Sequence, residues 1–153
     1  MTRGAIAYLI GGILGLVLLA VVKTCSAAET YRTLDMYPSG VQVEEIRDIW
    51  SGELTDAAIA RRPEASWVFI SLTDSAVNDV GVCHYYALAT TERVRNGALP
   101  FDEASTRFST LGHEMNSNVP SCNRLMLQGF QQSARRLSSY LEQQPLPTTK
   151  KSR

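Results

Sequence analysis

The stretch formed by residues 4–22 carries no charged side chain, and it constrains this chain more than any other feature. As an α-helix it would be roughly 28 Å long, close to the hydrocarbon thickness of a bilayer. Its length favours a retained transmembrane helix, because a secretory signal has a shorter apolar core. The small residues at 26–28 keep a cleaved signal peptide open as the alternative.

Both alternatives export the rest of the chain. Arg3 favours the cytoplasmic side for the amino terminus, which predicts a single-pass protein with its C-terminal domain outside the cytoplasm, periplasmic in a bacterium. Cleavage would instead give a secreted protein. A row of small residues would let a second membrane helix pack closely on this one. The row consists of Ala7, Gly11 and Gly15.

The remaining chain divides into three parts by composition. After a signal or anchor at 1–28, we expect an extended lead-in at 29–40, one domain at 41–144 and a disordered basic tail at 145–153. The chain has 15 basic and 15 acidic residues, which gives no electrostatic reason to expect nucleic acid as a partner. The sequence leaves the oligomeric state open.

Two of the three cysteines, Cys83 and Cys122, lie in the expected domain. Because disulfides persist outside the cytoplasm, export favours a bridge between them, with two separate buried thiols as the alternative. Cys25 is then the odd cysteine, free or paired between chains. A lipid on Cys25 is disfavoured, because the charged Lys23 stands where lipoprotein processing requires a small or apolar residue.

Apolar spacing predicts an all-α domain, a small bundle of four to five helices tied by the disulfide. Short helices are expected at 41–50 and 54–59, and a long helix is expected over 66–95, although 66–72 alone also fits a strand. The long helix rests on apolar residues three or four positions apart. These are Phe69, Leu72, Ala76, Val80, Cys83 and Ala87. Two more helices are expected, starting at the caps Asp102 and Ser121.

No catalytic pattern stands out, and we expect no cofactor and no metal ion. The chain contains no G-x-S-x-G nucleophile motif. His113-Glu114 resembles the start of a zinc-binding H-E-x-x-H helix, but Ser117 stands where the second histidine is required. A Cys83 nucleophile with the adjacent His84 has unsuitable geometry on a helix and is lost in a disulfide.

The sequence therefore favours a non-enzymatic binding module that acts on a protein partner in the cell envelope, of the inhibitor, immunity or accessory type. The expected contact surface is a rigid helix face with aromatic and arginine side chains. Its candidates are Tyr85, Tyr86, Arg93 and Arg95, with Arg135 and Arg136 as a second charged surface. A structural subunit of a membrane complex, packed through the small-residue row, is the first alternative, and an envelope hydrolase is the second.

Overall fold

A computed structural model describes residues 31–99 and 106–147 of the chain. The chain divides into a unit of residues 1–30 and a unit of residues 31–153. The expected membrane helix at 4–22, with its small-residue row, lies outside the described residues. Within the two described ranges, no helix is both long and apolar enough to cross a bilayer.

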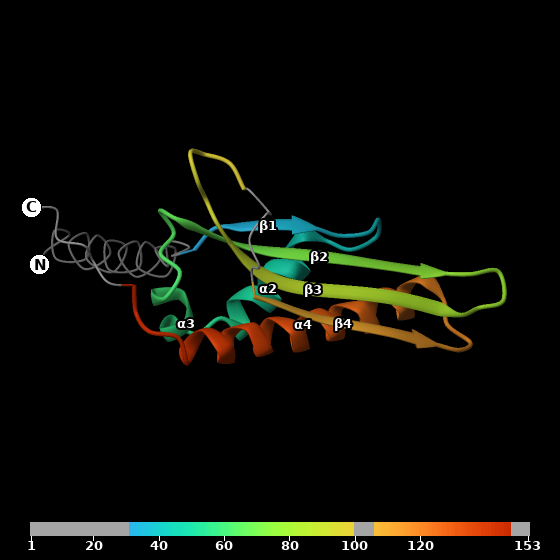
Figure 1. The fold of residues 1–153 in the computed structure, drawn as a ribbon. Coiled ribbons are helices and arrows are strands. Elements are labelled where there is room, and N and C mark those ends of the chain that lie inside the picture. The colour runs from blue at the N-terminus through green and yellow to red at the C-terminus, as the bar shows by residue number, and fades with distance from the viewer. Residues whose placement is uncertain (1–30, 100–105, 148–153) are drawn as a thin grey trace, which may run out of the picture. The chain divides into compact units, whose positions relative to one another are not determined.

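The described domain is an α/β fold in which three helices lie on one side of a four-stranded mixed sheet (Figure 1). The elements in chain order are β1 (Thr33–Met36), α2 (Val43–Glu53), α3 (Asp56–Ala60), β2 (Trp67–Val77), β3 (Cys83–Arg93), β4 (Arg107–Glu114) and α4 (Val119–Glu142). The strand order is β1-β2-β3-β4. β1 runs parallel to β2, whereas β2, β3 and β4 are antiparallel neighbours.

The expected all-α bundle is wrong, and the largest error is the long helix over 66–95. That segment forms the hairpin of β2 and β3, whose turn contains Gly81 at a φ of +77°. The apolar residues at helical spacing do not share one face. Phe69 points to the helices, Leu72 lies three pairs further along on the opposite face, and Val80 lies in the turn between the strands.

The inward face of β2 escaped the sequence analysis because half of its positions are polar. Ser71 and Thr73 are buried, and the hydroxyl of each donates a hydrogen bond to a residue of the neighbouring strand β1. The Ser71 hydroxyl donates to Asp35 Oδ1 at 2.7 Å, and the Thr73 hydroxyl donates to the Met36 carbonyl at 3.1 Å. A buried hydroxyl with a partner costs little, so these positions do not need apolar residues.

The helix expected over residues 102–115 is wrong as well, because β4 occupies Arg107–Glu114. The other helices were predicted correctly, and α4 is longer than expected. α4 starts at Val119 rather than after Ser121, because the Asn118 side chain accepts a hydrogen bond from the Ser121 amide at 2.9 Å. The expected lead-in at 29–40 includes β1.

The core lies between the sheet and the helices, and three aromatic rings form its centre. Trp50 of α2 packs edge-to-face on Phe69 of β2 and on Phe130 of α4, with ring centroids 5.7 Å and 5.0 Å apart. All three side chains are fully buried. The aromatic contacts therefore join both main helices to the sheet.

A disulfide joins Cys83, at the start of β3, to Cys122 in the first turn of α4. The S–S distance is 2.08 Å, and the two Cα atoms are 5.5 Å apart. This is the pairing that the sequence favoured. The bridge links the sheet to α4 at one end of the domain. From the sequence, a bridge to the last helix is expected as well, but from a long helix where the structure has β3.

Candidate binding surfaces

The sheet face that points away from the helices carries exposed apolar side chains. Phe69 packs on Trp50, so the alternation along β2 directs Leu72 to the opposite face. Met36 pairs with Leu72 across the β1–β2 ladder, which places both on that face. The exposed fractions are 42% for Met36, 37% for Leu72 and 79% for Leu111 of β4. We call this surface the open sheet face.

The open sheet face is covered by other residues at the end where β2 begins. Val68 and Ile70 are buried there, and Val68 lines a hollow together with Val94 and Leu99 of the segment after β3. Glu92, paired with Val68 across the ladder, is also buried, and its Oε1 has no hydrogen-bond partner in the described residues. On β2, the exposed apolar positions of this face therefore begin at Leu72.

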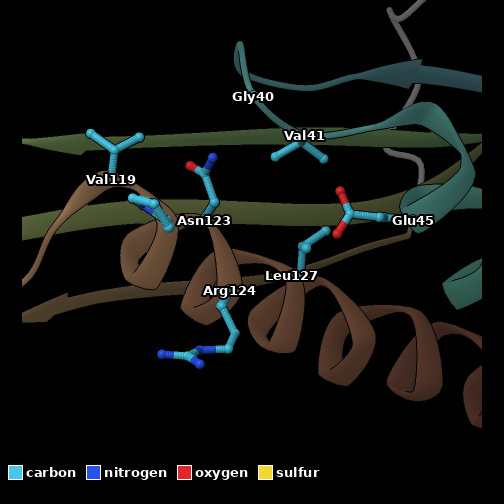
Figure 2. Close-up of a pocket in the computed structure, with 8 residues that line it drawn as sticks. Gly40, Val41, Glu45, Val119, Asn123, Arg124 and Leu127 are labelled. Atoms are coloured by element: carbon cyan, nitrogen blue, oxygen red, sulfur yellow. The ribbon is translucent and has the colours of Figure 1, made fainter.

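A separate groove lies between the start of α4 and the segment that leads from β1 into α2 (Figure 2). Its volume is about 420 Å³, within the range of small-ligand sites. Apolar side chains form much of its lining. The lining residues are Gly40, Val41, Glu45, Val119, Pro120, Asn123, Arg124 and Leu127.

The polar groups of this groove are largely used by the fold. Asn123 is buried, and its Oδ1 accepts a hydrogen bond from the Ser75 hydroxyl at 2.6 Å. Glu45 Oε2 accepts a hydrogen bond from the Gln42 amide at 2.9 Å, which caps α2. In Figure 2 the Arg124 side chain points away from Val41 and Asn123. The groove thus has apolar walls and structural polar groups rather than a convergent catalytic set.

The structure separates the two tyrosines of the expected contact surface. Both lie on β3 rather than on a helix, and adjacent strand residues point to opposite faces. Tyr85 points to the helices, where its ring fills the space left by Gly112 of β4 and Gly129 of α4. Tyr86 points to the open sheet face, where it pairs with Leu111. A helix face that presents both tyrosines does not exist in this fold.

The arginines of the expected surface also fall into separate places. Arg93 is exposed at the end of β3, and Arg95 follows it in a turn closed by backbone hydrogen bonds with Ala98. Arg135 and Arg136 lie on the exposed side of α4. None of these four arginines is positioned on the open sheet face beside Leu72 and Leu111.

Arg135 joins α4 to α2 through Glu53. Its Nε lies 2.8 Å from Glu53 Oε2, and its Nη2 lies 2.9 Å from Glu53 Oε1. The hydrogen bond from Arg135 holds the pKa of the Glu53 carboxyl below its ordinary value, and the same contact raises the pKa of Arg135. This arginine therefore has a structural partner inside the domain.

The sheet brings the two histidines of the chain together, which the sequence analysis did not anticipate. His84 of β3 lies directly opposite His113 of β4 in the antiparallel ladder. Both side chains are exposed. In the expected fold the two histidines belong to two different helices, so nothing placed them together. The pair becomes apparent only when both segments are assigned as neighbouring strands.

The described residues contain no group of three or more His, Cys, Asp or Glu side chains that could hold a metal ion. Cys83 and Cys122 are joined to each other, so neither is available as a nucleophile. His84 and His113 are both exposed, and His84 lines a hollow on the open sheet face.

Comparisons with known proteins provide little further information. No family model and no curated protein matches the chain. Among solved structures, the chain is similar to a minor lipoprotein from Acinetobacter baumannii, with 9% identity and a TM-score of 0.36 over 74% of this chain and 88% of that chain. A protein described as a lipoprotein from Caulobacter crescentus has 14% identity and a TM-score of 0.31, over 72% and 84%.

Proposed function

We propose that this chain is a non-enzymatic binding module, exported or anchored in the membrane, that acts on a protein partner in the cell envelope. The observation that carries the proposal is the exposed apolar row on the open sheet face, formed by Met36, Leu72 and Leu111. Met36 and Leu72 are paired neighbours on β1 and β2, and Leu111 lies on the other edge strand, β4, two positions further along the same face. Exposed apolar patches of this kind mark surfaces that bind other proteins.

The arrangement of β2 strengthens the proposal. A sheet with one solvated face normally places apolar residues inward and polar residues outward. The second half of β2 partly reverses this pattern: Thr73 and Ser75 point toward the helices, whereas Leu72 and Ala76 point outward on either side of Asp74. Solvation alone does not account for outward apolar residues, whereas a partner that covers them does.

The proposed mechanism is steric. Tyr86 and Leu111 lie opposite each other on this face, so an aromatic ring and an aliphatic side chain meet a partner together. Aromatic anchors at the centre of an interface contribute much of the binding free energy. A flat sheet face that covers a site on the partner would block access to that site.

A photocrosslinking amino acid at position 72 or 111 tests the proposal in the native host. We expect a crosslinked partner band from both positions and none from Gln132, an exposed control position on α4. Leu72→Asp and Leu111→Asp should abolish the complex. The change at Leu111 should affect stability little, because that side chain is 79% exposed, and thermal unfolding of the Leu72→Asp variant verifies that it is folded. Equal crosslinking from position 132, or complexes that survive both substitutions, contradicts the proposal.

A second pair of substitutions distinguishes the binding module from the alternative, a structural subunit of a membrane complex. Replacing Gly11 and Gly15 by Leu removes the small-residue row. The binding-module proposal expects function to survive this change, whereas a membrane subunit packed through that row would lose assembly.

A further inference from the structure

The pairing of His84 with His113 is a geometric feature that the proposed function does not use. Residues directly opposite each other in an antiparallel ladder have Cβ atoms about 4.5–5.5 Å apart and point to the same face. The chain contains two histidines in total, and the fold places both at this one pair of positions. Both side chains are exposed, so solvent reaches them.

We propose that His84 and His113 form a site for one divalent transition-metal ion of the Ni²⁺, Cu²⁺ and Zn²⁺ class. Imidazole nitrogens suit these metals, and they bind at about 2.0–2.1 Å. Two imidazoles that start about 5 Å apart on one face can both reach an ion held between and above them. Hard cations such as Ca²⁺ and Mg²⁺ prefer oxygen ligands and are not expected here.

The surroundings of the pair favour a cation. His84 lines a hollow of about 170 Å³ together with Asp74, Tyr86 and Leu111. Asp74 is the carboxylate among the residues that line this hollow, and its Oδ1 accepts a hydrogen bond from the Ser75 amide at 2.9 Å. A carboxylate close to the bound ion stabilises its positive charge and the orientation of its water ligands.

Two protein ligands leave other positions on the ion open. Structural zinc sites have four protein ligands, so this site belongs to the open kind, in which water or a group from another molecule completes the coordination. The site lies on the same face as the exposed apolar row. Metal binding by the chain alone does not depend on the proposed partner, so either proposal can fail without the other.

Calorimetric titration of the full chain with Ni²⁺ tests the site. The protein carries no polyhistidine tag, and the Cys25 thiol is alkylated, because thiols also bind this ion. We expect one Ni²⁺ per chain, and about tenfold weaker binding in each of His84→Asn and His113→Asn. Ser109→Asn, a matched change on the same face of β4, should leave the affinity unchanged.

A relocated histidine separates the pair geometry from histidine content. In His113→Asn, the additional change Ser109→His restores two histidines on the open sheet face, but position 109 pairs with Leu88 rather than with His84. We expect no recovery of Ni²⁺ binding. Wild-type affinity in this variant, or in either single histidine variant, would overturn the proposal.

Chemical modification supplies the same test without a substitution. Diethyl pyrocarbonate modifies the imidazoles of the folded wild-type chain, and both histidines are exposed to it. The modified protein should lose Ni²⁺ binding while its thermal unfolding stays unchanged. Binding that persists after complete modification of both histidines would equally refute the site.

Discussion

Trp50 donates the hydrogen of its indole Nε1 to Asp35 Oδ1 at 3.0 Å, which fastens helix α2 to the edge strand β1. The same carboxylate oxygen accepts the hydroxyl of Ser71 from the neighbouring strand. Trp50 and Ser71 are both fully buried. One carboxylate therefore satisfies two buried donors that have no access to water.

Asp35→Ala should lower the free energy of unfolding by about 2–4 kcal/mol, because it leaves both buried donors without an acceptor. Asp35→Asn keeps an oxygen at this position and should cost about half as much. Urea denaturation measures both values. Asp48→Ala, at an exposed position on α2, is the control and should change the stability by less than about 0.5 kcal/mol. A cost for Asp35→Ala as small as that of the control would refute this role.

Reduction of the Cys83–Cys122 disulfide should destabilise the domain. The bridge spans 39 positions, which corresponds to about 4 kcal/mol in the chain-entropy model. That is a large fraction of the roughly 5–15 kcal/mol typical of a domain of this size. Comparing the melting temperature of the Cys83→Ala/Cys122→Ala variant with that of the oxidised wild type tests this prediction. Equal melting temperatures would mean that the unfolded chain gains no freedom from losing the bridge.

Alanine substitutions at two glycines should change the stability in opposite directions. A Cβ at Gly112 would overlap the Tyr85 ring, so Gly112→Ala should lower the stability by about 1–3 kcal/mol. A Cβ at Gly52 of α2 meets no atom within 4 Å, so Gly52→Ala should raise the stability by about 0.5–1 kcal/mol. Chemical denaturation of both variants tests the pair. If Gly112→Ala is as stable as the wild type, the Tyr85 ring does not pack against Gly112 and this prediction is wrong.

The ion pair between Arg135 and Glu53 should make part of the stability depend on pH. Arg135 lowers the pKa of Glu53 below 4.5, so the pair stabilises the fold above that pH and loses its effect as the pH falls through the lower folded-state pKa. Arg135→Ala should therefore melt below wild type at about pH 7 and together with it at about pH 2. Arg136→Ala, the exposed neighbour, should match wild type throughout. A difference that persists in acid would point to packing instead.

The sequence predicted the parts of this fold that pack with a 3.6-residue period. α4 buries a continuous stripe that includes Met126, Phe130 and Leu137, and α2 buries Ile46 and Trp50 at the spacing of one turn. For these helices the apolar residues are the buried residues, so periodicity and burial agree. The cysteine pairing also followed from the small number of cysteines in the expected domain.

The strands were missed because burial and polarity disagree along them. The inward positions Ser71 and Thr73 are polar, and the outward positions Leu72 and Leu111 are apolar. Residues from both faces together imitate a helical stripe. The same inversion hid the open sheet face and the histidine pair, because register follows from hairpin geometry and not from the local pattern.

The parallel pairing of β1 with β2 has a mechanical consequence. A pulling force that reaches the domain from residues before Thr33, directed along β1, loads the hydrogen bonds of the β1–β2 ladder together instead of one after another. Strands loaded in shear resist extension better than strands that are peeled apart. The bridge between Cys83 and Cys122 encloses β3 and β4, so these two strands cannot be drawn out into an extended chain while it is intact, even after β1 has detached.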